Sequence, residues 1–320
     1  MKTTVIIPNY NGIKYLRNCL MSLREDSADT PIIVVDNGSS DGSEKVYSGF
    51  DGVTQIRNTE NLGFSAAVNQ GILAAKTEYV ILLNNDIEVK TGFIHALETA
   101  LDKDPRVFSA QAQMRSLHEP ERLDGAGDYY CALGWPLAAA KGRNISCRAN
   151  RGKWIFSSCA GAAIYRREQL ISFGLFDELH FAYFEDVDVG YRARILGYRN
   201  RYVPEAVVLH AGSAFSGSRH NAFKVNLSSA NSIYLIAKNM PFLQILLNLP
   251  FLVLGYLVKI LYFTRKGLGG VYLRGLCKGF AKAFSKRGRE RKVRFSFKNL
   301  GNYCKIQLEL WGNLFRLLER

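Results

Sequence analysis

The feature of this sequence that most limits its possible folds is an apolar run that ends in two amides and a carboxylate, Val80-Ile81-Leu82-Leu83-Asn84-Asn85-Asp86. Four consecutive apolar residues are typical of a central strand in a parallel sheet, because both faces of such a strand are covered. In open α/β sheets, ligands bind beyond the carboxyl ends of the strands. Asp86 would lie there, and its oxygens suit Mg²⁺ or Mn²⁺. The competing interpretation is a strand that ends in an Asx turn and binds no ligand.

Apolar segments alternate with helical patterns through the N-terminal part of the chain. Residues 3–7, 32–35 and 53–57 are predicted strands, and the apolar spacing of residues 15–23 predicts an amphipathic helix. Strands that alternate with helices through short loops indicate βαβ units and a parallel sheet. Right-handed crossovers would then bring the strand ends to one edge of the sheet. The polar residues expected at that edge are Asn9, Asp36, residues 58–61 and Asp86.

The sequence contains neither a GxxxxGK[ST] phosphate loop nor a GxGxxG fingerprint. These absences argue against a P-loop enzyme and against a dinucleotide-binding dehydrogenase. A diphosphate that binds without a glycine-rich loop needs another source of positive charge, and a metal ion on Asp86 would supply it.

Seven short segments carry further motifs: VIIPNYN at 5–11, VVDNGSSDGS at 34–43, NLGF at 61–64, LLNND at 82–86, FDE at 176–178, FEDVD at 184–188 and VLH at 208–210. Together they resemble the family 2 glycosyltransferases, which are inverting enzymes with the GT-A fold. The resemblance extends over about residues 1–215 and is nearest to the bacterial rhamnosyltransferase-like enzymes of cell-surface polysaccharide assembly. It implies an α/β fold, with a Rossmann-like, mostly parallel sheet flanked by helices.

The resemblance assigns roles to individual positions. Asp86 takes the last position of the family's DxD-type metal motif, whose first position here is the neutral Asn84. A histidine in the place of His210 can complete the metal or diphosphate site, so a divalent cation, Mn²⁺ or Mg²⁺, is expected on Asp86 and His210. Asp36 would accept a hydrogen bond from the base imide. The residues expected to bind the nucleotide sugar are Pro8, Asn9, Tyr10, Asn11, Asp36, Asn61, Gly63, Asn84, Asn85, Asp86 and Arg192.

Three acidic residues, Glu185, Asp186 and Asp188, begin a predicted helix that stops at Gly197. Acids in a first turn can simply complement the helix dipole, but the family's acidic pair maps onto Glu185-Asp186. A single displacement requires a carboxylate that takes the proton of the acceptor hydroxyl as the new bond forms. We expect Asp186 to be this catalytic base, kept ionised by the helix N-terminus, with Glu185 as the alternative.

Positive charge is concentrated at the C-terminal end of the chain. Residues 238–320 hold 17 Lys/Arg and 3 Asp/Glu, which accounts for the whole net charge of +14, so residues 1–237 are neutral overall. Such an asymmetry indicates an anionic partner, either a membrane surface or nucleic acid. A basic cluster interleaved with aliphatic residues favours anionic lipid.

Residues 242–263 form an apolar run that is long enough to cross a membrane. Its polar positions nevertheless fall within one narrow stripe, which favours an amphipathic helix that lies in the membrane interface. The competing interpretation is a helical cap that packs on the catalytic domain. The residues of the stripe are Gln244, Asn248, Lys259 and Lys266.

The predicted organisation is a GT-A catalytic domain at 1–237 and a basic, amphipathic helical membrane-association region at 238–320. Within the catalytic domain, 1–110 would be the donor-binding half and 111–237 the acceptor and base half. The glycine-rich connection at 115–155 is expected to help form the acceptor side. A loop expected to cover the diphosphate contains Ser213, Ser216 and Arg219.

The expected function is metal-assisted, inverting transfer of a sugar from a nucleotide-diphosphate donor to a hydroxyl of a saccharide on a polyprenyl diphosphate. The resemblance favours dTDP-L-rhamnose as the donor, and a hexose or galactofuranose is compatible with the same motifs. The expected location is cytoplasmic, peripheral on the cytoplasmic face of the cell membrane, with an anionic membrane surface and no nucleic acid as partner. The six cysteines lack a metal-like spacing, which agrees with a reducing cytosol. Two alternatives stay open, a nucleic-acid-binding protein and a catalytically idle scaffold that binds a nucleotide sugar.

Overall fold

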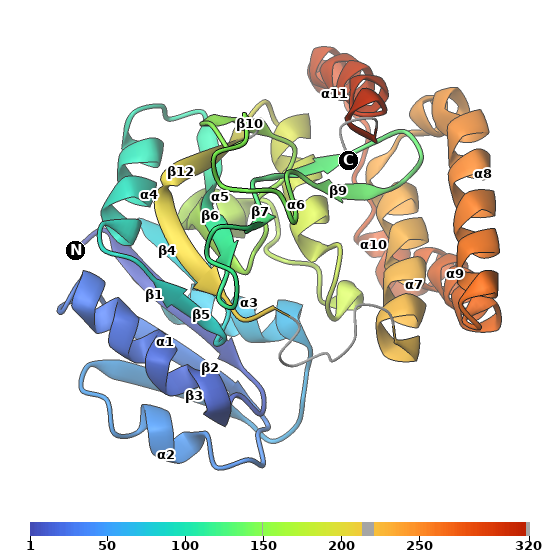
Figure 1. Ribbon diagram of the computed structural model, residues 1–320. Coiled ribbons are helices and arrows are strands. Elements are labelled where there is room, and N and C mark those ends of the chain that lie inside the picture. Colours follow the sequence, from blue (N-terminus) through green and yellow to red (C-terminus); the bar gives the residue numbers. More distant parts are fainter. Residues whose placement is uncertain (149, 213–220, 318–320) are drawn as a thin grey trace.

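Among the residues that the computed structural model describes, 1–148, 150–212 and 221–317, the apolar run lies at the centre of a mixed, ten-stranded sheet (Figure 1). It forms strand β4, all of whose residues are buried. The neighbouring strands β1, β2 and β3 follow in that order on one side, and every adjacent pair is parallel. The bounds of these strands are β1 (Thr3–Asn9), β2 (Ile32–Asn37), β3 (Val53–Asn58) and β4 (Tyr79–Leu83).

On its other side, β4 pairs antiparallel with β11 (Ala162–Arg166), which in turn pairs antiparallel with β6 (Val107–Ser116). β12 (Arg199–His210) runs parallel to β6, so β1, β2, β3, β4, β6 and β12 all point the same way, and β11 runs against them between β4 and β6. Short strands divide the connection at 115–155, which therefore has regular structure. These strands are β7 (Leu123–Gly125), β8 (Asp128–Tyr130), β9 (Pro136–Ala138) and β10 (Lys153–Ile155). A further short strand, β5 (Ile87–Val89), lies earlier in the chain and pairs with β12.

Helices cover both faces of the sheet, as its continuously apolar strands require. α1 (Ile13–Asp26) and α4 (Phe93–Asp102) share one hydrophobic cluster with β4. α3 (Phe64–Ala74), α5 (Arg167–Ser172) and α6 (Glu185–Ile195) share the cluster on the opposite face. The short helices α2 (Glu44–Tyr47) and η1 (Glu178–His180) complete this part of the chain. The predicted α/β class, a mostly parallel sheet flanked by helices, is confirmed.

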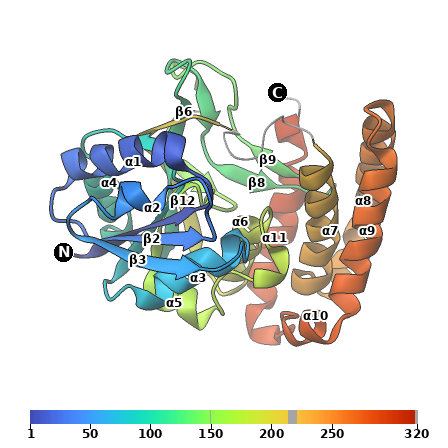
Figure 2. The ribbon, with the colours of Figure 1, turned by 90° about the horizontal axis from the view of Figure 1, so that it is seen from below.

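The C-terminal helices gather on the side of the molecule away from β1–β3 (Figures 1 and 2). One hydrophobic cluster joins α7, α8 and α11 to α6 and to the β8–β9 hairpin, so these helices pack against the sheet domain. The boundary expected at 237/238 falls inside α7. The helices are α7 (Ala222–Asn239), α8 (Phe242–Arg265), α9 (Gly269–Phe284), α10 (Lys286–Glu290), η2 (Phe297–Asn299), α11 (Leu300–Gly312) and η3 (Phe315–Leu317).

The polar residues of α8 face the protein, although a helix in a membrane interface would turn them toward water. Gln244 and Asn248 are both buried. Tyr191 of α6 donates a hydrogen bond to Gln244 Oε1 at 2.8 Å, and Asn248 Nδ2 donates to Gln307 Oε1 of α11 at 2.8 Å. Buried amides need hydrogen-bond partners. Because those partners lie on α6 and α11, this half of the stripe packs on the protein, as the competing interpretation of a helical cap expects, whereas Lys266 just after the helix is exposed.

The outward surface of α8 is apolar and exposed. The helix has 24 residues, and an 18-residue stretch of it has a mean hydropathy of 1.9 and is 17% buried. By length and composition it could therefore cross a membrane. A large exposed apolar patch marks a binding surface for another protein or for a membrane. The exposed large apolar residues of α8 are Phe242, Leu243, Leu246, Leu247, Leu249, Val253, Leu254, Leu257, Val258, Leu261 and Tyr262.

Candidate active site

Polar side chains at the carboxyl ends of β1, β2 and β4 form one hydrogen-bonded cluster. Asn9 is buried at the end of β1, and its amide donates to Asp36 Oδ1 and to Ser39 Oγ, both at 3.2 Å. Asn85 reaches back from the end of β4 and donates to Asn9 Oδ1 at 2.7 Å. Tyr47 donates to Asp36 Oδ2 at 3.1 Å. The parallel sheet thus brings together three residues predicted for the donor site, Asn9, Asp36 and Asn85.

Asn37, next to Asp36, organises the adjoining loop. Its amide donates to Asn61 Oδ1 at 2.9 Å and to the Gly63 carbonyl at 3.1 Å. Gly63 has a φ of 89°, and a Cβ there would lie 2.6 Å from the ring of Phe181. Only glycine permits this conformation so close to the ring. Asn61 and Gly63 therefore lie at the same sheet edge as Asp36, beside the segment that precedes α6.

The other predicted residues near the end of β1 lie at the surface of this cluster. Pro8 and Tyr10 are half-buried, and Asn11 is exposed. Asn11 has a φ of 51° and accepts a hydrogen bond from the Ser40 amide at 2.9 Å. This bond joins the turn after β1 to the glycine-rich turn after β2, so the two turns form one rim beside Asp36.

Asp86, His210 and Asp124 form a row of interacting groups. His210 Nε2 lies 3.4 Å from Asp86 Oδ1, and His210 Nδ1 lies 2.7 Å from Asp124 Oδ2. Burial disfavours the charged imidazole, but hydrogen bonds to the two carboxylates outweigh it and raise the pKa of His210 to about 9. Asp86 follows β4, Asp124 lies in β7 and His210 ends β12, so only the sheet brings the three together.

This arrangement suits a divalent cation. A carboxylate oxygen of Asp86 and the Nε2 of His210 face one another, so a cation can replace the proton that they share. Asp124 engages the other ring nitrogen, which orients a metal-binding imidazole and selects its tautomer. Asn84, the neutral first position of the motif, lies beside them at the end of β4.

The second acidic cluster lies at the start of α6. Asp186, Asp128 and Cys159 each have a ligand-type atom within 4.8 Å of the others. Burial raises the pKa of the Cys159 thiol well above its usual range, and Mg²⁺ and Mn²⁺ prefer oxygen ligands to sulfur. The Asp86–His210 pair, which has no thiol among its groups, therefore suits such a cation better than this cluster does.

The carboxyl groups of this cluster and of the neighbouring Glu185 differ in pKa. Burial raises the pKa of Asp186 to about 6, although backbone N–H groups oppose the shift. Burial, followed by repulsion from Asp186, raises the pKa of Glu185 and of Asp128 well above their usual values. Asp186 is thus the member most readily ionised at neutral pH, and such divergence is typical of acid–base sites. Backbone N–H groups at the helix N-terminus favour the ionised form of Asp186, although burial has the larger effect on its pKa.

A small-residue turn at 159–161 joins the two acidic clusters. The backbone N–H of Asn84 donates to the Gly161 carbonyl at 2.9 Å. The backbone N–H of Ala160 donates a hydrogen bond to Asp186 that favours its ionised form. A Cβ on Gly161 would lie 3.1 Å from Asn84 Nδ2. The backbone of this turn therefore contacts both Asn84, two residues before Asp86, and the carboxylate of Asp186.

Arg192 does not lie at the donor site. Its guanidinium is buried and donates to Asp188 Oδ2 at 2.7 and 3.0 Å, and to the carbonyls of Phe173 and Leu175. Lys238 also donates to Asp188 Oδ2, at 2.8 Å. The carboxylate of Asp188 points away from solvent, so Arg192 neutralises a buried charge inside the fold. The expectation that Arg192 binds the nucleotide sugar is therefore wrong.

Two site residues were not predicted, Asp124 and Asp128. Both lie in the segment Asp124-Gly125-Ala126-Gly127-Asp128, where two carboxylates flank three small residues. The tight backbone is required, because a Cβ on Gly127 would lie 2.3 Å from the side chain of Ile155. This spacing sends Asp124 to His210 and Asp128 to Asp186, so the 115–155 segment contributes one carboxylate to each cluster.

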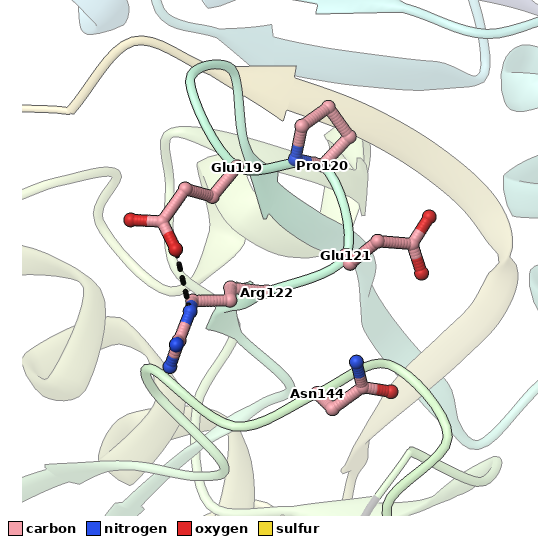
Figure 3. Close-up of a pocket in the computed structure, with 5 residues that line it drawn as sticks. All are labelled: Glu119, Pro120, Glu121, Arg122 and Asn144. Atoms are coloured by element: carbon pink, nitrogen blue, oxygen red, sulfur yellow. Dashed lines mark ion pairs between the residues drawn. The ribbon is translucent and has the colours of Figure 1, made fainter.

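A surface pocket lies elsewhere, between the 119–122 loop and Asn144 (Figure 3). Glu119 and Arg122 form an ion pair at 2.6 Å on its rim. The residues that line it include none of those predicted for catalysis or donor binding. Ser213, Ser216 and Arg219, expected to cover the diphosphate, lie outside the described residues.

Comparison with known proteins identifies relatives of this chain. The family model described as Glycosyl transferase family 2 matches residues 4–173. The N-acetylglucosaminyl-diphospho-decaprenol L-rhamnosyltransferase of Mycobacterium tuberculosis is 29% identical over 233 residues, which are 64% of this chain and 75% of that protein. The structure of GalNAc-T7 with UDP, GalNAc and Mn²⁺ has a TM-score of 0.60 at 16% identity, over 74% of this chain and 48% of that chain. The mannosyltransferase PcManGT from Pyrobaculum calidifontis, in complex with GDP-Man and Mn²⁺, has a TM-score of 0.54 at 18% identity, over 97% and 84% of the two chains. At such identities the two structures show a common fold.

Proposed function

Because this chain belongs to glycosyl transferase family 2 and is a glycosyltransferase, we propose that it transfers L-rhamnose from dTDP-L-rhamnose to a hydroxyl of a saccharide linked to a polyprenyl diphosphate. The single observation that carries a transfer mechanism is the pairing of an Asp86–His210 site with the Asp186 cluster across the 159–161 turn. The choice of sugar and acceptor rests on the similarity to the mycobacterial rhamnosyltransferase named above.

The donor would lie along the carboxyl ends of β1, β2 and β4. Asp36 is held by Asn9 and Tyr47 in a fixed position beside the rim formed by the turns after β1 and β2. A base imide would share this carboxylate, and the half-buried Tyr10 would contact the base at the rim. Asp86 and His210 would hold a divalent cation, and that cation would supply positive charge to the leaving diphosphate. The Mn²⁺ in both structural neighbours supports this part of the proposal.

The acceptor hydroxyl would approach from the side of Asp186. Its proton passes to the Asp186 carboxylate while its oxygen bonds to the anomeric carbon and the bond from that carbon to the diphosphate breaks. The products are the glycoside, the nucleoside diphosphate and a protonated Asp186. Attack opposite the leaving group inverts the configuration of the sugar. Glu185 and Asp128 hold their protons more tightly, and a protonated carboxyl can donate a hydrogen bond to the acceptor.

The C-terminal helices would bring this site to an anionic membrane. Exposed aromatic residues lie among exposed basic residues, a combination that inserts into the apolar zone and attracts anionic headgroups. Phe284 is 70% exposed and Phe297 is 82% exposed, on either side of the basic α10 segment. The exposed basic residues between them are Lys286, Arg287, Arg289, Arg291, Lys292 and Arg294. This charge complementarity, together with the apolar face of α8, favours lipid over nucleic acid and a position on the cytoplasmic face of the membrane.

We infer that α8 lies on the membrane and does not cross it. Its buried residues are Gln244, Asn248, Leu252 and Gly255, which form one stripe along the helix. A Cβ on Gly255 would lie 2.4 Å from the Leu133 carbonyl, so the helix packs tightly against the protein in its fourth turn. A helix fastened along much of its length to the catalytic domain presents only its outer face to lipid.

The test is nucleoside diphosphate release from a panel of dTDP-, UDP- and GDP-sugars, with Mn²⁺ or Mg²⁺ and with or without a lipid extract of the native host. Release from dTDP-L-rhamnose that requires metal and increases with lipid is the expected result. Release from a different donor alone would mean that the transferred sugar is not L-rhamnose. Release without metal would contradict the proposal that Asp86 and His210 hold a divalent cation. Nucleotide binding without release from any donor, with lipid present, would favour the scaffold alternative.

A further inference from the structure

The segment that leads into the catalytic cluster, residues 179–184, is called the base loop here. Three of its residues have positive φ without being glycine: Phe181 at 62°, Tyr183 at 69° and Phe184 at 72°. Side chains disfavour this conformation, and it persists only where the surrounding structure holds it. Phe184 is also the residue immediately before α6. The base loop therefore sets the position of Glu185 and Asp186, and something outside the loop must stabilise it.

Asn231 of α7 provides most of that support. It is fully buried, and its Nδ2 donates to the carbonyls of His180, Ala182 and Tyr183 at 2.7, 2.9 and 2.8 Å. The two hydrogens of this amide nitrogen thus serve three carbonyls within four consecutive residues, with one hydrogen shared between two of them. Loss of this side chain would remove its hydrogen bonds to the partly buried carbonyls of Ala182 and Tyr183, whereas the His180 carbonyl would keep the Ala182 N–H at 2.7 Å.

Lys282 of α9 completes the support. Its Nζ donates to the Leu179 carbonyl, and also to Asn231 Oδ1 at 2.7 Å, which orients the amide of Asn231 toward the base loop. The remaining carbonyl, that of Phe181, accepts from the Ser65 amide of α3 at 3.1 Å. Every carbonyl from 179 to 183 is therefore held, four from the C-terminal helices and one from the donor side.

α9 is locked to α7 by two glycines. A Cβ on Gly275 would lie 1.8 Å from Ser229 Oγ, and a Cβ on Gly279 would lie 2.4 Å from the Ala230 carbonyl. The opposite face of α9 carries the exposed residues Leu273, Phe280 and Phe284. α9 thus has one face that supports the base loop and another that faces outward beside the apolar surface of α8.

We propose that Asn231 and Lys282 are positioning residues that hold the base loop so that Asp186 meets the acceptor hydroxyl. This inference rests on the proposed role of Asp186 as the base. It makes the helices beyond the sheet domain part of the catalytic apparatus, because the groups that orient the base come from the helices that carry the apolar surface.

The test compares full-length Lys282→Met and Asn231→Ala with wild type in two assays. Hydrogen–deuterium exchange reports the base loop in peptides that span residues 179–187, without any substrate. Turnover of dTDP-L-rhamnose with Mn²⁺ gives kcat and KM, and titration with dTDP gives nucleotide affinity. Lys278→Met is the matched control, because Lys278 lies one turn earlier on α9 and is exposed. Lys282→Arg, which keeps a charged donor, is the rescue variant.

The expected result is faster exchange in the base loop and a kcat lower by about 10- to 100-fold in both variants, with KM and dTDP affinity within about twofold of wild type. Lys282→Arg should recover most of the kcat, and Lys278→Met should behave as wild type. Unchanged exchange in Lys282→Met and Asn231→Ala would overturn the proposal, as would a fall in kcat that merely parallels a loss of dTDP-binding protein. If wild type releases no dTDP from the donor, the proposed function fails for that sugar, while the exchange data still decide whether these residues hold the loop.

Discussion

The rate of sugar transfer should fall steeply below about pH 6, because Asp186 must be ionised to accept the proton of the acceptor hydroxyl. Burial raises the pKa of Asp186 to about 6. At that pKa the ionised fraction is about 0.9 at pH 7 and about 0.1 at pH 5, whereas a carboxyl with an ordinary pKa of about 3.9 stays about 0.9 ionised at pH 5. The buried base therefore predicts a rate at pH 5 about tenfold below that of an exposed one.

The assay is initial nucleoside diphosphate release at saturating donor, acceptor and Mn²⁺, from about pH 4.5 to about pH 8. Protein held at each pH and returned to neutral pH controls for irreversible loss of activity. In Glu185→Gln the transfer rate should still fall near pH 6, because burial of Asp186 itself is the main cause of its raised pKa. A wild-type rate that stays constant down to pH 5 would refute the reasoning, since the proton would then go to a group of ordinary pKa.

Four further predictions concern the metal, the base, the membrane and the C-terminal helices. Asp86→Ala should abolish metal-dependent binding of the nucleotide sugar in calorimetry, and binding that still requires Mn²⁺ would remove Asp86 from the metal site. Asp186→Asn should bind the donor normally and lose at least about 10²-fold in kcat, because an amide cannot accept the proton; if Glu185→Gln suffers this loss and Asp186→Asn does not, the base is Glu185. Leu257→Asp, on the exposed face of α8, should weaken cosedimentation with anionic vesicles, and unchanged binding would argue against that face as the lipid contact. Deletion of residues 241–320 should lower kcat by at least about 10-fold even with a water-soluble acceptor, because Lys282 is lost; a truncated protein that folds and turns over as wild type would contradict this.

The sequence alone determined the donor edge of the fold. The apolar run before Asp86 and the alternation of short strands and helices are local patterns, and the geometry of parallel sheets converts them into a shared edge for Asn9, Asp36 and Asp86. The acidic start of α6 and the glycine stop after it are equally local. The family motifs cover the same positions. The residue patterns and the family resemblance therefore predicted the same location for the donor site and the acidic pair.

Only the tertiary structure decided which charges serve the site and which serve the core. The spacing of Asp188 and Arg192 along α6 is the same whether the two side chains face a ligand or each other. In the structure they face each other, and the buried Lys238 also donates to Asp188. Likewise, Gln244 and Asn248 form the same stripe whether it faces water or protein, and their partners come from distant parts of the chain. Asp124 and Asp128 become site residues because β7 and β8 bring them to His210 and Asp186. A sequence pattern gives the direction of a side chain within its own element, whereas contacts across long separations decide what that side chain meets.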